Sequence, residues 1–157
     1  MSVNNKVMEY LDKNKAEYRV VTHDRVFTTI AEARALGIEA DEIAKCLVIK
    51  IRSELALAVI PGGHRINNRK IREACGNKHA RMATEDELGA DFSQWELGAV
   101  PPLGELFRLP VYMDRSLIGN ETVLFSGGSH TESIKMNTAD FINLIKPDLV
   151  DLVEEER

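Results

Sequence analysis

The stretch DEIAKCLVIKIRSELALAVIPGG, residues 41–63, decides the fold. Its opening DEIAK predicts a short helix that runs directly into CLVIKI, which has the continuous apolar pattern of a buried strand. LALAVI, residues 55–60, predicts a second apolar strand, which the following Pro-Gly-Gly ends. The segment between the two strands is short and polar, so we expect the strands to form a hairpin.

Short helices and short strands are predicted on both sides of this hairpin in the sequence. Apolar residues at helical spacing behind a capping residue predict helices over 3–11, 30–36, 69–75, 84–88 and 138–145. Clusters of β-branched and aromatic residues predict strands over 18–22, 79–82, 109–113, 122–125 and 132–136. Strands and helices without strict alternation favour an α+β fold, with a central mixed, largely antiparallel β-sheet or barrel flanked by short helices.

Local signals add detail at the ends of these elements. The expected N-caps are Ser2, Thr28 or Thr29, Asn67 or Asn68, Thr84 and Thr138. We expect Gly127-Gly128-Ser129 to connect the last two strands as a hairpin turn, and the terminal DLVEEER, 151–157, to be frayed.

The length and composition fit one globular domain over residues 1–157. The chain is 44% hydrophobic and 29% charged, which argues against a disordered protein. It contains no apolar run of the roughly 18 residues that a membrane span needs, and its N-terminus lacks the apolar core of a secretory signal. Cys46 and Cys75 form no CxxC pair, so we expect a cytoplasmic protein with free thiols.

The charge is unevenly distributed along the chain. The net charge is −5, yet residues 45–81 contain nine basic residues against Glu54 and Glu73, so this basic island carries +7. Such an island could meet phosphates. Alternatively it is a solvated face whose charges pair with acidic elements folded over it. The sequence leaves both interpretations open.

Two segments have features that a purely structural chain does not require. Lys45 stands where the predicted short helix becomes an apolar strand, so its ammonium must either reach solvent along its stem or find a partner. Residues 98–104, GAVPPLG, form a stiff loop whose backbone amides could stabilise charge on a carbonyl oxygen. A plain surface turn is the alternative for this loop.

A third segment is GGSHT, residues 127–131, in which the glycine pair lets backbone approach a ligand closely. No GxSxG motif surrounds Ser129, so we do not interpret it as an activated nucleophile. The other histidines, His23, His64 and His79, lack a metal-ligand spacing, and phosphate-binding and dinucleotide-binding glycine motifs are absent. We therefore expect neither a metal nor a cofactor.

Together these segments resemble a known family. The order IAKCLVIK, LALAVIPGGHRINNRKI, ELGAVPPLG, LPVYMD and FSGGSHTESIKMNTADF is similar to the YbaK-like aminoacyl-tRNA deacylases, and the likeness runs from about residue 18 to residue 146. These enzymes are the freestanding relatives of the editing domain of bacterial prolyl-tRNA synthetases. The resemblance implies a single α+β domain that hydrolyses the ester of mischarged aminoacyl-tRNA without a metal, through a water activated by the substrate's own 2′-hydroxyl.

The resemblance also implies roles for particular residues. Lys45 would contact the 3′ end of the tRNA, and the loop of residues 98–102 would hold the aminoacyl carbonyl and the terminal ribose. The catalytic set implied is Lys45, Gly98 and His130, and the substrate-binding set is Ala99, Val100, Pro101, Pro102, Gly128 and Ser129. From the basic island we expect Arg65, Arg69, Lys70 and Arg72 to contact the acceptor stem.

Specificity and activity class stay open at this point. Cys46 follows the lysine where the alanine-specific branch of the family tends to have asparagine, so alanine specificity is not supported, and nothing favours cysteine specificity. We expect a small pocket to select the amino acid by size. The alternatives are a non-catalytic module that binds aminoacyl-tRNA or a synthetase, and a small-molecule esterase or amidase that uses the same pocket.

Overall fold

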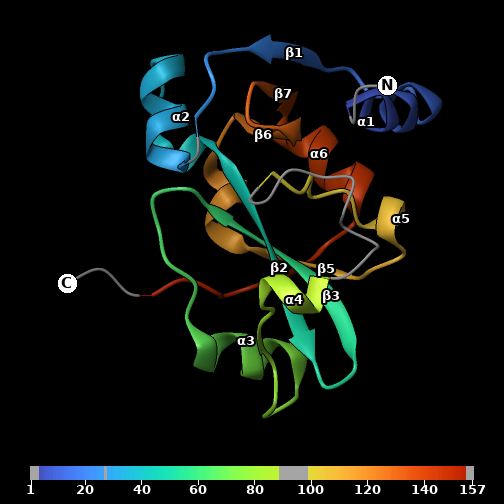
Figure 1. Ribbon diagram of the computed structural model, residues 1–157, viewed down its shortest axis with the longest axis vertical. Helices are drawn as coiled ribbons and strands as arrows, with labels where there is room; N and C mark the ends of the chain where they lie inside the picture. The colour runs from blue at the N-terminus through green and yellow to red at the C-terminus, as the bar shows by residue number, and fades with distance from the viewer. Residues whose placement is uncertain (1–3, 27, 89–98, 155–157) are drawn as a thin grey trace.

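The predicted hairpin forms the centre of the larger of two sheets (Figure 1). The computed structural model describes residues 4–26, 28–88 and 99–154. Strands β2 (Ala44–Ile51) and β3 (Glu54–Pro61) pair antiparallel along their full length. Arg52 takes a left-handed conformation, φ 58°, in the two-residue turn between them. The sequence prediction of this hairpin is confirmed.

Three further strands complete this sheet in the order β4-β2-β3-β5-β8. β4 (Arg81–Met82) pairs antiparallel with β2, whereas β5 (Val111–Asp114) and β8 (Asp148–Val150) continue the sheet in parallel beyond β3. The strand β8 was not predicted, because three residues are too few to show a hydrophobic period.

The second sheet is antiparallel, with the order β1-β7-β6. It contains β1 (Arg19–Thr22), β6 (Thr122–Ser129) and β7 (Glu132–Asn137). The hairpin between β6 and β7 is as predicted, but the predicted turn at Gly127-Gly128-Ser129 is wrong. These residues belong to β6, where the register shifts between Ser126 and Ser129, and Gly128 has a φ of 102° that favours glycine there.

The two sheets meet at the beginning of β2. Ile43, just before β2, forms a parallel bridge with Leu124 of β6. The short helix predicted over DEIAK proves to be a single 3-10 turn, η1 (Ala40–Glu42), and the chain is extended from Ile43 onward because Ile43 and Ala44 are buried between neighbouring strands. Lys45 is therefore the second residue of a strand that belongs to the junction of the sheets.

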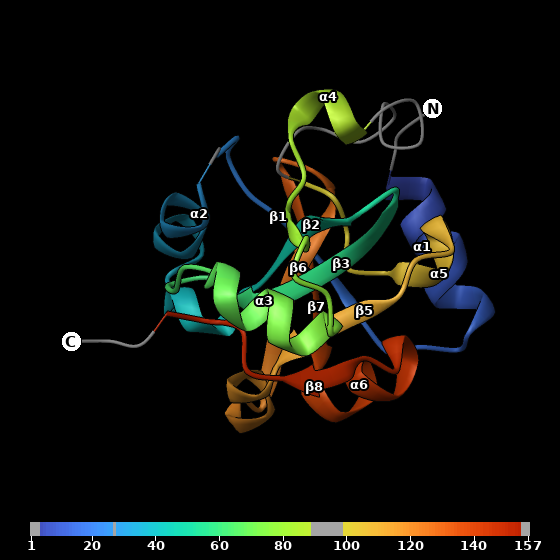
Figure 2. The same cartoon turned by 90° about the horizontal axis from the view of Figure 1, so that it is seen from below.

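Short helices cover the sheets. Their bounds are α1 (Asn4–Lys13), α2 (Thr29–Leu36), α3 (Asn68–Cys75), α4 (Glu85–Leu88), α5 (Gly104–Phe107) and α6 (Thr138–Ile145), and η3 (Arg115–Gly119) is a further 3-10 helix. In both views α1 and α2 lie on opposite sides of the molecule (Figures 1 and 2). The segments α5 and η3 were not predicted, because a single helical turn carries too little pattern.

The caps explain where the longer helices begin. The Thr28 hydroxyl accepts a hydrogen bond from the Ala31 amide, and the Asn67 side chain accepts one from the Lys70 amide. For α6 the prediction was off by one residue, because the side chain of Asn137, rather than Thr138, accepts from the helix amides. The predicted cap Ser2 lies outside the described residues.

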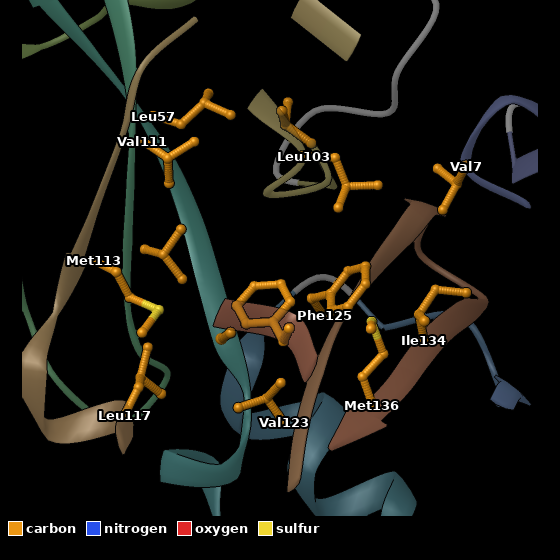
Figure 3. Close-up of a cluster of buried hydrophobic side chains, with 14 of the residues drawn as sticks. Val7, Leu57, Leu103, Val111, Met113, Leu117, Val123, Phe125, Ile134 and Met136 are labelled. Atoms are coloured by element: carbon orange, nitrogen blue, oxygen red, sulfur yellow. The ribbon is translucent and has the colours of Figure 1, made fainter. Parts of the chain in front are cut away.

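The main core fills the space between the two sheets (Figure 3). Leu57 and Met113 of the larger sheet face Phe125 and Ile134 of the smaller one, and Val7 of α1 closes one edge. A second core lies on the other face of the larger sheet, beneath α3. Burial of one such side chain contributes roughly 1.5–3 kcal/mol.

The C-terminal segment is part of this second core. Leu152 is fully buried, its amide donates to the Asp114 carboxylate over 2.8 Å, and Val153 bridges to Ile66. The expectation of a frayed tail is therefore wrong for residues 151–154, because one buried leucine and one backbone bridge hold them.

The α+β class with mixed and antiparallel strands is confirmed, in two sheets joined at one corner rather than in a barrel. In the described part of the chain, no helix has the length and apolar character needed to cross a membrane.

Candidate active site

A cavity of about 540 Å³ opens where the two sheets meet. It is bounded by α2 with the residues before it, by the beginning of β2, by the loop after β3 and by the end of β6. The lining side chains that bear on the chemistry are His23, Thr28, Thr29, Glu32, Lys45, Cys46, His64, Arg65, Ser126, Ser129 and His130, and Ala99 also lines it. The cavity thus combines segments that are far apart in the sequence.

Lys45 lines this cavity from β2, and its side chain is half-buried. Across residues 4–26, 28–88 and 99–154, no hydrogen bond or ion pair of its ammonium is found. Of the two possibilities that the sequence leaves for Lys45, the structure favours an ammonium at the cavity wall without a protein partner. A partly desolvated cation in that position is suited to an anionic or carbonyl ligand.

The glycine-proline loop reaches the cavity only at one end. Ala99 lines the cavity, whereas Val100, Pro101 and Pro102 are buried and do not line it. The Ser126 hydroxyl donates to the Ala99 carbonyl over 2.6 Å and accepts from the Gly128 amide over 3.0 Å. This ties the described beginning of the loop to β6. Gly98, which the family resemblance places in the catalytic set, lies outside the described residues.

The predicted glycine-serine-histidine segment also reaches the cavity in part. Ser129 and His130 line it, and Gly128 is buried behind them. The His130 carbonyl accepts a hydrogen bond from the Val26 amide over 3.2 Å, which holds the turn after β6 beside the segment that precedes α2. Lys45, Ala99, Ser129 and His130 are thus brought together around one cavity.

The predicted tRNA-binding residues divide into two groups. Arg65 lines the cavity and is exposed, and Arg69 and Arg72 are exposed on α3. Lys70 is only 7% exposed, and its ammonium lies 3.1 Å from the Asp151 carboxylate and donates to the Val153 carbonyl over 2.7 Å. Lys70 therefore holds the C-terminal segment against α3 and presents no free ammonium to a ligand.

Another part of the basic island pairs with acid, as the alternative interpretation expects. The Glu87 carboxylate lies 2.8 Å from the Lys50 ammonium and 2.7 Å from the Arg81 guanidinium. These hydrogen bonds, the one from Arg81 first, hold the pKa of Glu87 well below its usual range. The two basic groups thus fix the beginning of α4.

Three residues that sequence reasoning missed form a hydrogen-bonded row at the cavity wall. His23 Nδ1 donates to the Asp24 carbonyl over 2.8 Å, and His23 Nε2 lies 3.0 Å from the Ser133 hydroxyl. The Ser133 hydroxyl in turn donates to Glu32 Oε1. The His23 and Glu32 side chains are 4% and 17% exposed. No sequence signal joins these residues, since 110 positions separate His23 from Ser133.

A second polar contact lies at the loop after β3. The Asp41 carboxylate accepts from the Gly63 amide over 3.2 Å and lies 3.3 Å from His64 Nε2. Gly62 is required for this packing, because a Cβ there would lie 2.2 Å from the Thr29 methyl group and 2.7 Å from the Ala40 carbonyl oxygen. The Pro-Gly-Gly that ends β3 therefore also places His64 and Arg65 at the cavity.

Cys46 lines the cavity next to Lys45. Burial raises the pKa of the Cys46 thiol well above its usual range, so the thiol stays protonated and is a poor nucleophile at neutral pH. Among the described residues, no three His, Cys, Asp or Glu side chains come together in a way that could hold a metal ion.

The chain is similar to proteins of known activity. The chain is 25% identical over 150 residues to the "Multifunctional Ser/Thr-tRNA deacylase ProXp-y" of Escherichia coli K12, and the match covers 92% of this chain and 89% of that protein. It is 34% identical over 91 residues to the proline–tRNA ligase of Shouchella clausii, which covers 58% of this chain but only 16% of the ligase.

A solved structure described as a candidate trans-editing enzyme for prolyl tRNA synthetase superposes with a TM-score of 0.86 at 26% identity, over 99% of both chains. The sequence profile of the aminoacyl-tRNA editing domain matches residues 23–144, which include every described residue that lines the cavity. The chain therefore belongs to the aminoacyl-tRNA editing domain family, in its YbaK-like branch.

Proposed function

We propose that this protein hydrolyses the ester bond of mischarged aminoacyl-tRNA in trans. The observation that carries the proposal is the convergence of Lys45, Ala99 and His130 on one cavity in a chain of the editing family. Its volume of about 540 Å³ falls within the range of roughly 300–1,000 Å³ that small-molecule sites occupy. The terminal aminoacyl-adenosine of a tRNA is a ligand of that size class.

In the proposed reaction, water attacks the ester carbonyl carbon and the bond to the ribose oxygen breaks. The products are the free amino acid and a tRNA whose terminal hydroxyl has taken up a proton. An aminoacyl ester is already activated, so positioning of water and stabilisation of the oxyanion suffice as catalytic effects. The substrate's own 2′-hydroxyl orients the water, and the proposal assigns no metal to the reaction.

Each residue has a defined part in this proposal. The Lys45 ammonium acts as a point charge on the ester carbonyl or the terminal phosphate. The amides of the loop that begins at Gly98 and Ala99 donate to the developing oxyanion, and one such donor is worth roughly 10²–10³ in rate. His130 and Ser129 contact the bound ester from the opposite segment. Arg65, Arg69 and Arg72 contact the acceptor stem, and Lys70 is left out because of its contact with Asp151.

The proposed substrates carry small side chains, because the cavity must hold the adenosine as well as the amino acid. Serine and threonine esters come first in the test, since the E. coli relative is named for them. Discrimination by size is worth only about 1–3 kcal/mol per methylene, so we expect several small amino acids to be removed at different rates.

The test is a panel of labelled aminoacyl-tRNAs, with the loss of ester measured over time. We expect at least one small aminoacyl ester to be cleaved, and Lys45→Ala to reduce the rate by about 10²-fold or more. Lys50→Ala is the matched control, because Lys50 lies on the same strand outside the cavity. If no ester is cleaved faster by the wild type than by Lys45→Ala, the proposal is wrong.

The exposed arginines favour one second candidate, a module that binds aminoacyl-tRNA without cleaving it. Arg69 and Arg72 project from α3, and Arg65 lies at the cavity itself. This candidate predicts tRNA binding that weakens steeply with salt while the ester stays intact. The same panel, with retained tRNA measured beside cleaved ester, separates the two functions.

A further inference from the structure

One wall of the cavity carries a negative charge that has no part in the proposed reaction. Glu32 of α2 lines the cavity, and only 17% of its side chain is exposed. A largely buried carboxylate is costly unless it meets hydrogen-bond donors or a cation. In a cavity proposed to hold the end of a polyanion, this group needs an explanation.

The structure holds this carboxylate by one oxygen. Glu32 Oε1 accepts from the Ser133 hydroxyl, and the same hydroxyl lies 3.0 Å from His23 Nε2. The His23 ring is fixed in turn by the Asp24 carbonyl. Within the described residues no hydrogen bond to Glu32 Oε2 is found, so one carboxylate oxygen is oriented by its partner and still able to accept.

The charged and titratable groups around Glu32 set what this oxygen could bind. His23 is the nearest, with Nε2 at 3.8 Å from Oε1. Lys45, His64, Arg65 and His130 also line the cavity, and among the described residues neither Lys45 nor Arg65 forms an ion pair with Glu32 within 4.0 Å. The cavity therefore combines two cationic side chains, Lys45 and Arg65, which are suited to phosphate or carbonyl oxygens, with the Glu32 carboxylate, which is suited to a cationic ligand.

We propose that Glu32 binds the α-ammonium group of the aminoacyl ester, and that Ser133 and His23 are positioning residues for it. This inference rests on the proposed function and adds a substrate class: esters whose α-amino group is free. An aminoacyl ester carries its ammonium on the carbon next to the carbonyl. Opposite charges at Glu32 and Lys45 therefore orient the ester in one direction. N-acylated esters lack the cation and are excluded.

The experiment compares one aminoacyl-tRNA that the wild type cleaves with the N-acetylated form of the same aminoacyl-tRNA. We expect the wild type to cleave the N-acetylated ester at least about 10-fold more slowly, since hydrogen bonds to charged groups are among the stronger ones. Glu32→Gln should slow cleavage of the free ester by a similar factor and leave the N-acetylated ester nearly unchanged, so that the discrimination is lost.

Control variants separate this role from a structural one. Glu121→Gln changes an exposed carboxylate outside the cavity and should keep the wild-type discrimination. Ser133→Ala keeps the charge of Glu32 but removes its anchor, and should give a discrimination between those of the wild type and Glu32→Gln. Glu32→Asp keeps the negative charge on a shorter side chain and should retain part of the discrimination between the free and the N-acetylated ester.

Two results would overturn the inference. One is a wild type that cleaves both esters at the same rate, and this comparison decides the matter even where a variant folds poorly. The other is a Glu32→Gln that slows both esters equally, which is the signature of a structural role. A wild type that cleaves no aminoacyl ester at all is a different result, and it rejects the proposed function itself.

Discussion

Two lysines of the same basic island, Lys45 and Lys70, have opposite surroundings. Lys70 on α3 is 7% exposed, and its ammonium contacts the Asp151 carboxylate and the Val153 carbonyl. Lys45 on β2 is half-buried at a cavity, and its ammonium has no partner in the part of the chain that the structure describes. The first lysine has a structural role in holding the C-terminal segment, whereas the second is available to a ligand.

The two regions around these lysines differ in the same way. Beneath α3, Leu152 is fully buried and its amide meets the Asp114 carboxylate, so apolar and polar groups are both satisfied. At the cavity, Lys45 is partly desolvated and has no counter-charge in contact among the described residues, whereas Glu32 accepts from the Ser133 hydroxyl and lies 3.8 Å from His23 Nε2. A partly buried charge without a partner costs stability, so a charge that is kept despite this cost is typical of functional sites.

The strongest test of this comparison exchanges each lysine for methionine, which keeps the apolar stem and removes the charge. Lys45→Met should lower the rate of ester cleavage by about 10²-fold or more while the free energy of unfolding stays within about 1 kcal/mol of the wild type. Lys70→Met should destabilise the protein by roughly 1–3 kcal/mol and keep the rate of the folded enzyme. Urea unfolding and single-turnover cleavage measure the two quantities.

The opposite pattern would contradict the assignment of roles. A Lys45→Met protein that loses stability and keeps its rate would make Lys45 structural. A Lys70→Met protein that loses the rate at full stability would place Lys70 in the site despite its contacts.

The next effect concerns the apolar part of the α3 region. Leu152→Ala should destabilise the protein by about 2–5 kcal/mol, because the side chain is fully buried and its removal leaves a cavity. The matched control is Ile118→Ala, since Ile118 is 50% exposed and should cost less than about 1 kcal/mol. A Leu152→Ala protein as stable as the control in urea would show that residues 151–154 are not held as the structure places them.

Local signals in the sequence were sufficient for most of the fold. The hairpin of β2 and β3 follows from two apolar runs. Thr28 and Asn67 were each one of two adjacent cap candidates, because capping depends on residues only three positions apart. The predictions failed where distant segments decide. DLVEEER is polar enough to look frayed, yet one leucine reaches the core beneath α3.

The candidate site was predictable in part. Lys45 and the segments that contain Ala99 and His130 were singled out from their own residues, the family resemblance supplied roles for them, and the structure places all three at one cavity. The row of His23, Ser133 and Glu32 could not be predicted, since each residue alone is unremarkable and only the folding of α2 against β7 brings them together. The charge count grouped Lys70 with the exposed arginines, because such a count cannot distinguish a cation that the fold pairs, as it pairs Lys70 with Asp151, from an exposed one.

A smaller effect is expected from the arginines of α3, which are exposed like solvated charges but lie on the same island as Lys45. Charge reversal of Arg69 and Arg72 should weaken tRNA binding several-fold at low salt. The logarithm of the binding constant should also fall less steeply with the logarithm of the salt concentration, by about one unit of slope for each phosphate that the variant no longer neutralises. Cleavage of a short aminoacyl-adenosine ester should stay unchanged.

The control for the arginines reverses Lys13 and Arg19, which are exposed on elements away from α3 (Figure 1). Equal weakening by both pairs would mean that only the net charge matters, and the assignment of α3 to the acceptor stem would be wrong.

The smallest effect involves Lys50, a third lysine of the island, which shares β2 with Lys45 but is paired. Arg81 and Lys50 hold the pKa of Glu87 well below its usual range. The stabilisation that this carboxylate provides is therefore fully present above the unfolded pKa of about 4.3 and is lost as the pH falls through the lower folded-state pKa. Urea unfolding of the wild type and Glu87→Gln at pH 7 and at pH 2–3 should show a difference that shrinks toward acid.

The same difference should shrink in 1 M NaCl, where the Debye length is only about 3 Å and exposed ion pairs are screened. Cleavage by Glu87→Gln at pH 7 should match the wild type, because neither Glu87 nor Lys50 lines the cavity. A lower cleavage rate with unchanged stability would couple α4 to the cavity. Lys45 would then not be the only lysine of β2 on which the reaction depends, and pairing would no longer distinguish structural from functional charge on this strand.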